Sequence, residues 1–156
     1  MHKIAKVNDK FIKISKGSFY HYFRDHQELL DSMLDFWEVH ATKLIVQSME
    51  QQDASLEQLL QISFNRDKKI ENSIYTWAKY DPVVAARLVD IEEQRISCVA
   101  KLYQKMGINE AESVDRARLA YLTYVGWMTR FEANPNFDMD KMVELLTSFS
   151  GCPNIR

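Results

Sequence analysis

Residues 25–48 read "DHQELLDSMLDFWEVHATKLIVQS", and the spacing of their apolar residues predicts a long helix. Asp25 followed by Glu28 has the spacing of a capping box, in which two side chains satisfy backbone amides at a helix start. After this start, apolar or small residues recur every three or four positions, which is the period of one helix face over about residues 26–52. The residues on that face are Leu30, Leu34, Trp37, Ala41, Leu44 and Ser48.

The remainder of the chain continues this helical pattern. Asp81-Pro82 predicts the end of one helix and the start of another, because proline fits the first turn of a helix and disfavours the helix before it. Gly107 is expected to end the second of these, since glycine readily adopts the left-handed conformation found at helix ends. Four glycines and three prolines are too few for the many turns of an all-β protein. The sequence therefore predicts an all-α fold, with helices at about 26–52, 56–67, 71–80, 82–106, 110–133 and 139–149.

The helix expected at 110–133 is apolar on two faces, which predicts that both faces are buried. One face suits the core of the chain and consists of Val114, Ala117, Tyr121, Tyr124, Met128 and Phe131. The second face needs a different cover, and a second copy of the chain is the simplest one. We therefore predict a homodimer. Its expected interface residues, which include part of the last helix, are Leu119, Leu122, Val125, Gly126, Met142, Leu145, Leu146 and Phe149.

The sequence lacks the patterns of several other protein classes. No apolar run approaches the roughly 18 to 20 residues of a membrane-spanning helix, and there is no signal-peptide pattern. Cys98 and Cys152 are far apart and match no zinc-binding spacing. P-loop, nucleophile-elbow and metalloprotease motifs are also absent from the sequence. We expect a cytoplasmic protein that is not an enzyme, uses no cofactor and contacts no membrane.

The first 24 residues carry a positive charge that the rest of the chain does not share. They contain six Lys or Arg and one Asp, whereas the other residues contain 14 Lys or Arg and 21 Asp or Glu. Within them, "SKGSFYHYF" at 15–23 predicts a short helix that begins at Ser15 and buries Phe19 and Phe23. Its exposed first turn carries Lys16, whose side chain can reach phosphate or guanine in a DNA major groove. An amphipathic helix with no DNA contact explains the same spacing, and both interpretations stay open.

The sequence "ISKGSFYHYFRDHQELLDSML", residues 14–34, resembles the end of the helix-turn-helix and the next helix of TetR/AcrR-type transcriptional regulators. The later layout, which includes "WAKYDPVVAARL" and two closing helices, is also similar to that family. The resemblance implies a TetR-like helical bundle, with a DNA-binding head at 1–24 and an effector-binding and dimerisation bundle at 25–156. We expect the head to lack the family's first helix, so that the helix-turn-helix is incomplete. By the resemblance, the residues that meet DNA are Lys16, Gly17, Ser18, Tyr20, His21, Tyr22 and His26.

The resemblance implies a repressor that binds double-stranded operator DNA and responds to a small-molecule effector. A truncated protein of the same fold, which binds a ligand and dimerises but does not bind DNA, is the alternative. Arg95 interrupts the apolar face of the helix at 82–106 and is a candidate anchor for the effector. An ion-paired or solvent-directed arginine also explains it. The other expected pocket residues, which suit an ordinary aromatic core as well, are Phe64, Tyr75, Trp77, Tyr121, Tyr124 and Trp127.

Overall fold

The computed structural model describes residues 23–50, 54–131, 134 and 136–148. Every regular element in these residues is helical, and no strand occurs among them. The predicted all-α fold is therefore confirmed. The chain divides into two compact units, residues 1–36 and residues 37–156. The predicted DNA-contacting residues from Lys16 to Tyr22, and Phe149 of the predicted dimer interface, lie outside the described residues.

The described part of the first unit is the beginning of α3 (His26–Glu38). Asp25 Oδ1 accepts a hydrogen bond from the backbone amide of Glu28 at 2.9 Å, so Asp25 caps the helix. The Glu28 carboxylate turns back and accepts from the backbone amide of Arg24 at 2.5 Å, one residue before the partner expected in a capping box. The helix start predicted from Asp25 and Glu28 is confirmed. His26, a predicted DNA-contacting residue, is exposed in the first turn.

The second unit begins with the end of α3 and continues through η1 (Val39–Lys43) into α4 (Leu44–Met49). The predicted long helix is therefore confirmed as far as Met49, but its middle is a π-helix. Apolar residues spaced three and four apart have the period of an α-helix, so the sequence pattern does not predict a π-helix here. Ala41 and Thr42 of η1 are buried. π-helical turns are rare in proteins, and those that occur are often found at functional sites, so η1 indicates where in the unit a functional site is expected.

The start of α5 (Leu56–Asn65) follows from a capping box. The amide of Gln58 donates to Ser55 Oγ at 3.2 Å, and the amide of Ser55 donates to Gln58 Oε1 at 3.1 Å. Two amides at the helix start are thereby satisfied reciprocally. α6 (Lys69–Ala78) comes next and begins slightly earlier than the sequence pattern predicts.

Both ends of α7 (Pro82–Lys105) follow from the residues that the sequence singles out. Asp81 Oδ1 accepts hydrogen bonds from the amides of Val83 at 2.9 Å and Val84 at 3.2 Å. Pro82 stands at the first helical position, where a backbone amide has no partner inside the helix. Its lack of an amide hydrogen therefore costs no helical hydrogen bond. Gly107 follows the last turn with a φ of 89°, a conformation that other residues rarely adopt. The predicted helix from Pro82 is confirmed at both ends.

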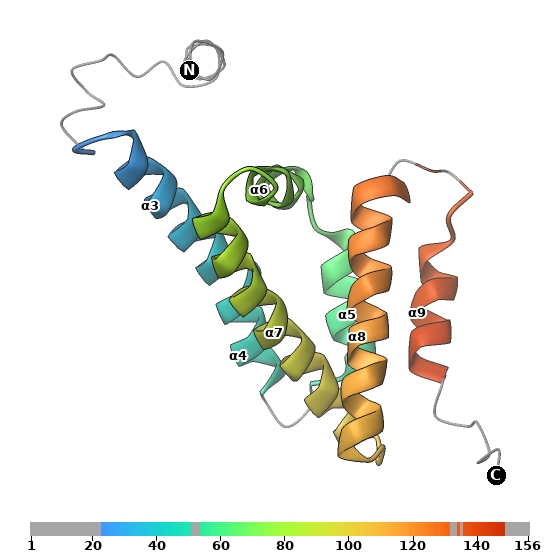
Figure 1. Cartoon of the computed structure of the whole chain (residues 1–156). Coiled ribbons are helices and arrows are strands. Elements are labelled where there is room, and N and C mark those ends of the chain that lie inside the picture. Colours follow the sequence, from blue (N-terminus) through green and yellow to red (C-terminus); the bar gives the residue numbers. More distant parts are fainter. Residues whose placement is uncertain (1–22, 51–53, 132–133, 135, 149–156) are drawn as a thin grey trace. The chain divides into compact units, whose positions relative to one another are not determined.

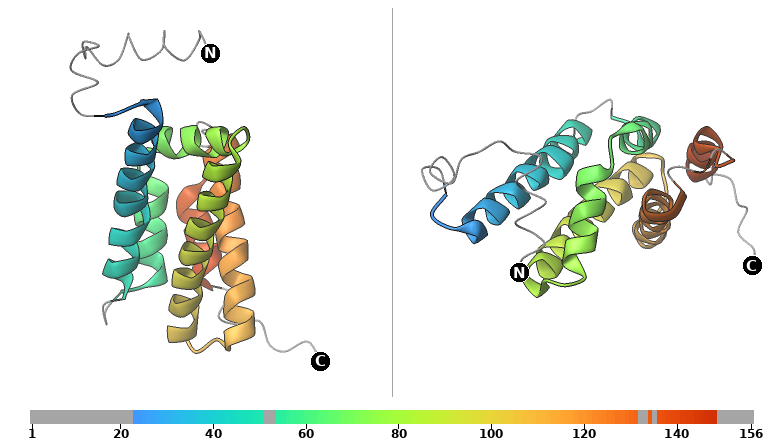
Figure 2. Two further views of the ribbon diagram at one scale, coloured as in Figure 1. Left: turned by 60° about the vertical axis from the view of Figure 1, so that its left-hand side comes forward. Right: turned by 90° about the horizontal axis from the view of Figure 1, so that it is seen from above.

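α8 (Glu110–Gly126), η2 (Trp127–Phe131) and α9 (Met139–Ser148) complete the described part of the second unit. α7 and α8 lie side by side and antiparallel, and α6 lies across one end of the unit (Figures 1 and 2). α9 packs against α5. Buried side chains between these helices form one continuous core. Its larger members are Leu56, Leu59, Leu60, Phe64, Leu102, Tyr103, Tyr121, Tyr124, Trp127, Met128, Val143 and Leu146.

The inner face predicted for α8 is in the core. Of the six predicted residues, Ala117, Tyr121, Tyr124 and Met128 are buried and Val114 is partly buried, and the side chain of Phe131 lies outside the described part of the structure. Small residues at this face allow close contact with α7, since the side chain of Ala117 is fully buried. The aromatic residues of the same face extend toward α5 and α6, where they form part of the wall of the site described below.

The residues predicted for the dimer interface differ in burial. Leu119, Leu122 and Leu145 are exposed, and we call these three residues the outer face. Leu146 instead lies in the core, where its carbonyl oxygen accepts a hydrogen bond from the Tyr103 hydroxyl at 2.8 Å. A helix turns by about 100° per residue, so neighbours in sequence point in different directions. The remaining predicted interface residues are partly buried; these are Val125, Gly126 and Met142.

Candidate functional site: an amphipathic cavity

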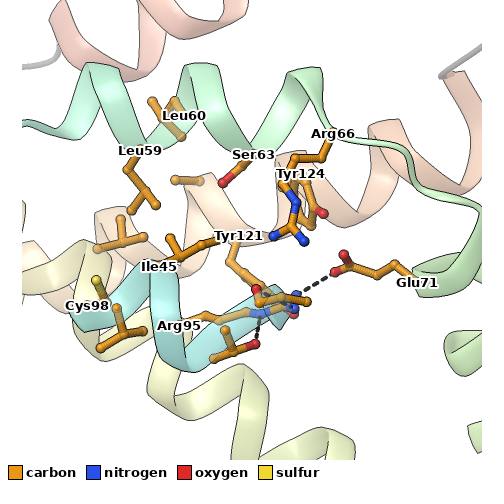
Figure 3. A pocket seen from close by; sticks show the side chains of 15 residues that line it. Ile45, Leu59, Leu60, Ser63, Arg66, Glu71, Arg95, Cys98, Tyr121 and Tyr124 are labelled. Atoms are coloured by element: carbon orange, nitrogen blue, oxygen red, sulfur yellow. Dashed lines mark hydrogen bonds and ion pairs between the residues drawn. The ribbon is translucent and has the colours of Figure 1, made fainter. Parts of the chain in front are cut away.

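A cavity of about 70 Å³ lies inside the second unit, among η1, α4, α5, α6, α7 and α8. In Figure 3, Leu59 and Leu60 lie at one end of it, and Arg66 and Glu71 lie at the other. The cavity therefore has an apolar end and an ionic end. The other side chains that line it are Ala41, Thr42, Ile45, Val46, Ser63, Arg95, Cys98, Val99, Ala120, Tyr121 and Tyr124.

Arg95 in α7 closes the ionic end. Its Nη1 donates to Glu71 Oε1 at 2.5 Å, and its Nε donates to Thr42 Oγ1 at 3.0 Å. Its Nη2 donates to the carbonyl oxygen of Ala41 at 3.3 Å, and its Cζ lies 5.3 Å from the ring centre of Trp37. Only 12% of the Arg95 side chain and 8% of the Glu71 side chain are exposed. Of the interpretations of Arg95, the ion-paired arginine is the one that these contacts support.

Arg95 and the tyrosines near it keep their usual charge states at neutral pH. Burial lowers the pKa of the Arg95 guanidinium, the negative charge of Glu71 raises it, and the net pKa lies above its ordinary value. Burial and the Glu71 carboxylate raise the pKa of Tyr124. Burial likewise raises the pKa of Tyr121 and of Tyr75. The guanidinium therefore stays charged, and the three phenols stay neutral hydrogen-bond donors.

A chain of hydroxyl groups leads from the cavity wall to α7. The Tyr121 hydroxyl lies 2.6 Å from the Tyr75 hydroxyl, which donates to Glu92 Oε1 at 3.1 Å. A phenol has a single proton to donate, and that of Tyr75 goes to the Glu92 carboxylate, so Tyr121 is the donor to Tyr75. The proton of Tyr121 is therefore used within the protein and is not offered to a ligand.

Arg66 retains the most unused hydrogen-bonding capacity in the cavity wall. It follows the last turn of α5 with an extended backbone. Its Nη2 donates to the carbonyl oxygen of His40 in η1 at 3.3 Å, and it forms no ion pair with any residue that the structure describes. The Ser63 hydroxyl points into the cavity beside it (Figure 3). Sequence reasoning missed Arg66, because it lies in the charged stretch between α5 and α6, where a solvated side chain is the usual expectation.

Three of the predicted pocket residues line the cavity, namely Arg95, Tyr121 and Tyr124. Tyr75 is joined to the wall through its hydrogen bond with Tyr121. These four residues come from α6, α7 and α8, so the packing of helices distant in sequence brings them together.

The other predicted pocket residues lie outside the cavity wall. Phe64 and Trp127 pack edge to face in the core, with ring centres 5.1 Å apart. The Trp127 ring centre also lies 5.6 Å from the ammonium nitrogen of Lys68, a fully buried lysine that donates to the carbonyl oxygen of Ser63. Trp77 donates from Nε1 to Asp81 Oδ2 at 3.2 Å and so belongs to the turn between α6 and α7. These aromatic residues pack near the cavity but do not line it.

A second buried ionic group is centred on Glu38. Lys43 Nζ lies 2.9 Å from its Oε1, and Nη2 and Nε of Arg87 donate to its Oε2 at 2.8 Å and 3.1 Å. The hydrogen bond with Lys43 lowers the pKa of Glu38, burial opposes this change, and Arg87 lowers the pKa further. The net pKa lies below its ordinary value of 4.5. This group ties the start of the second unit to α7.

Replacing Glu38 with Gln should lower the melting temperature near neutral pH and have a much smaller effect in acid. The Glu38 carboxylate has a lower pKa in the folded state, so its stabilisation is complete above pH 4.5 and is lost as the pH falls through the folded-state pKa. Thermal unfolding of both proteins at several pH values, followed by circular dichroism, measures the difference. Glu144→Gln, an exposed change in α9, is the control. An equal loss for Glu38→Gln at every pH would contradict the prediction.

A second hollow, of about 590 Å³, lies along α4 and α7. Its rim carries the Lys101 and Glu50 side chains, which approach to 4.0 Å and are each more than half exposed. Val46 and Cys98 line both spaces. Burial raises the pKa of the Cys98 thiol, so the reactive thiolate is disfavoured. Because water competes for these exposed polar groups, the hollow is a weaker candidate for a specific ligand site than the cavity.

Within the described ranges, no three His, Cys, Asp or Glu residues are grouped so as to hold a metal ion. None of the helices described above combines the length and the apolar character needed to cross a bilayer. Comparison of the chain with protein-family models, with curated proteins and with solved structures finds no match. The function is therefore inferred from the chain's own residues.

Proposed function

We propose that the chain is a TetR-like transcriptional regulator. Its N-terminal residues bind double-stranded operator DNA, and the unit at 37–156 binds a small-molecule effector and a second copy of the chain. The amphipathic cavity carries this proposal, because a concave space with an apolar wall and a few directed polar groups is the usual form of a small-molecule site. The resemblance of residues 14–34 to the DNA-binding end of such regulators supports the DNA-binding part.

The π-helix η1 supplies a route from the cavity to the DNA-binding end. Arg66 donates to the carbonyl oxygen of His40, and Arg95 donates to that of Ala41. In the chain, η1 follows α3 directly, and the predicted DNA-contacting residues precede α3, apart from His26 in its first turn. An effector that draws Arg66 away from His40 removes one hydrogen bond that holds η1. A segment that can change between two helical forms, each favoured by one ligand, couples two binding sites.

The homodimer part of the proposal is supported by the outer face. Apolar side chains are exposed on α8 at Leu119 and Leu122 and on α9 at Leu145. A second copy that packs on this face would remove these side chains from water. Two copies also suit an operator, because paired recognition helices read half-sites about 34–36 Å apart along the DNA.

A ligand-binding protein that does not contact DNA is the second candidate. The unit at 37–156 is compact by itself and contains every residue that lines the cavity. Ligand binding and dimerisation therefore require none of the predicted DNA-contacting residues. DNA binding by the whole chain distinguishes the two candidates.

DNA from the chain's own promoter region should bind the full-length protein with an affinity that falls steeply with salt. Lys and Arg that neutralise phosphates release counterions, so affinity should drop at least about tenfold between roughly 50 and 200 mM salt. Lys16→Ala should weaken binding and reduce the slope of log affinity against log salt by about 1, as expected for one lost phosphate contact. Fluorescence anisotropy with labelled DNA measures both effects.

Lys141→Ala is the matched control for this experiment, since Lys141 is an exposed lysine of α9 in the second unit. It should leave DNA binding unchanged. If promoter DNA and unrelated DNA bind equally weakly, and Lys16→Ala has no effect, the regulator proposal is wrong and the second candidate function is favoured.

A further inference from the structure

We propose that the cavity binds a short aliphatic carboxylate, whose charged group pairs with Arg66 and whose carbon chain lies against Leu59 and Leu60. This inference rests on the proposed function, in which the cavity is the effector site, and it names the class of effector. The charges of the wall, its hydrogen-bonding groups and its size each point to this class.

The charges of the cavity wall favour an anion. The lining contains two guanidinium groups, Arg66 and Arg95, and one carboxylate, Glu71. Glu71 is already paired with Arg95 at 2.5 Å. Arg66 is half-buried, and no carboxylate of the described residues pairs with it. The two oxygens of a ligand carboxylate match the planar pair of N–H groups on a guanidinium, and such charge-assisted pairs are stronger than neutral hydrogen bonds.

The hydrogen-bonding groups of the wall also favour a ligand group that accepts hydrogen bonds over one that donates them. The Ser63 hydroxyl points into the cavity and has no hydrogen-bond partner among the residues that the structure describes (Figure 3). It can donate to a carboxylate oxygen held by Arg66. In contrast, the Glu71 carboxylate is committed to Arg95, and the Tyr121 proton is committed to Tyr75. An amine ligand would meet the positive charge of Arg66 and find its possible carboxylate partner already occupied.

The size and the apolar end of the cavity limit the ligand to a short carbon chain. A volume of about 70 Å³ is roughly half that of a 150 Å³ cavity that holds the six carbons of benzene, so the cavity has room for about three carbons, as many as butyrate carries beyond its carboxylate group. The end opposite Arg66 is lined by Ile45, Leu59 and Leu60 (Figure 3). These side chains favour methylene groups over water or further polar groups. In an acid of butyrate size, the charged group can lie at the ionic end of the cavity while the carbon chain lies at the apolar end.

Titration of the full-length protein with sodium butyrate tests this assignment. Binding is measured by isothermal titration calorimetry and by NMR of the isotope-labelled chain, with sodium chloride adjusted to keep ionic strength constant. Butyramide and n-butylamine serve as ligands of similar size that lack the negative charge. Arg66→Met removes the proposed partner, and Arg118→Met removes an exposed arginine of α8 that lies outside the cavity lining.

We expect saturable binding of one butyrate per chain, with shifts of the NMR signals of Thr42, Ser63 and Tyr121. Butyramide should bind at least about tenfold more weakly, and Arg66→Met should weaken butyrate binding by a similar factor, because each removes a charge-assisted pair. Arg118→Met should bind butyrate as the unchanged protein does. Circular dichroism of each variant shows whether it is folded, and the comparison of the three ligands on the unchanged protein does not depend on any variant.

Several results would overturn the assignment. These are an absence of saturable butyrate binding, equal affinity for butyramide, NMR shifts confined to residues outside the cavity, or a folded Arg66→Met protein with unchanged affinity. If the chain binds promoter DNA but not butyrate, the carboxylate assignment fails and the regulator proposal stands. If it binds butyrate as expected but not DNA, the carboxylate site stands and the second candidate function replaces the regulator.

Discussion

Replacing Arg95 with Met is expected to lower the free energy of unfolding by about 3–5 kcal/mol, because it breaks a buried ion pair and leaves one partner behind. Met fills much of the space of the aliphatic part of arginine but carries no charge. Glu71, whose side chain is 8% exposed, would then be buried without its cation. The change also removes the donors to Thr42 Oγ1 and to the carbonyl oxygen of Ala41. Urea unfolding of the full chain, followed by circular dichroism, measures the loss.

Two further variants separate the ion pair from general disruption. The double change Arg95→Met with Glu71→Leu should recover much of the lost stability, since apolar residues of similar volume often replace a buried ion pair at little cost. Arg118→Met breaks an exposed pair with Asp115, in which the arginine side chain is 57% exposed, and should cost less than about 1 kcal/mol. A loss for Arg95→Met as small as that for Arg118→Met would mean that the Arg95 pair is solvated, contrary to its burial here.

The helix boundaries could be predicted from the sequence because they depend on neighbouring residues. Asp25, Ser55 and Asp81 each cap a helix through contacts with amides two or three residues later. Gly107 ends α7 through its own backbone conformation. Such interactions are local, so a single short stretch contains all the information that they require. The all-α fold followed from the same local signals.

The candidate site could be predicted only in part, because its polar end is assembled by residues far apart in the chain. Arg95 and the tyrosines were selected because they interrupt or enrich an apolar helix face. Arg66 and Glu71 lie in or near a charged stretch that is typical of a solvated surface, and only the packing of α6 against α7 buries Glu71. The π-helix η1 escaped prediction because its apolar spacing does not differ from that of an α-helix.

Burial of neighbouring residues on α9 is a further point that the sequence does not decide. Leu145 and Leu146 are both leucines in a helix with an apolar face, yet one is exposed and the other is buried. Which of the two faces inward depends on how α9 is rotated against α5, a contact between elements separated by about half of the chain. The periodicity predicts that an apolar face exists, and the tertiary contact determines its centre.

The difference between a buried and an exposed leucine leads to opposite expectations for Leu146→Glu and Leu122→Glu. Leu146 is 5% exposed, so Leu146→Glu should destabilise the unit by more than about 5 kcal/mol, through lost apolar burial and a carboxyl group placed in the core. Since whole domains are stable by about 5–15 kcal/mol, most of this variant should be unfolded. Leu122 is 68% exposed, so Leu122→Glu should change the stability of a single chain by less than about 0.5 kcal/mol.

The same pair of changes also tests the proposed homodimer. If the outer face forms a two-fold interface, Leu122→Glu places like charges near each other across it and should yield a folded monomer, whereas the unchanged chain sediments as a dimer. Val89→Glu, an exposed change on α7, should alter neither folding nor assembly. Analytical ultracentrifugation and thermal melts of the four proteins give the answer. A monomeric unchanged chain, or a Leu122→Glu protein that is still a dimer, would remove the outer face as the interface, and a well-folded Leu146→Glu protein would contradict the position of Leu146 in the core.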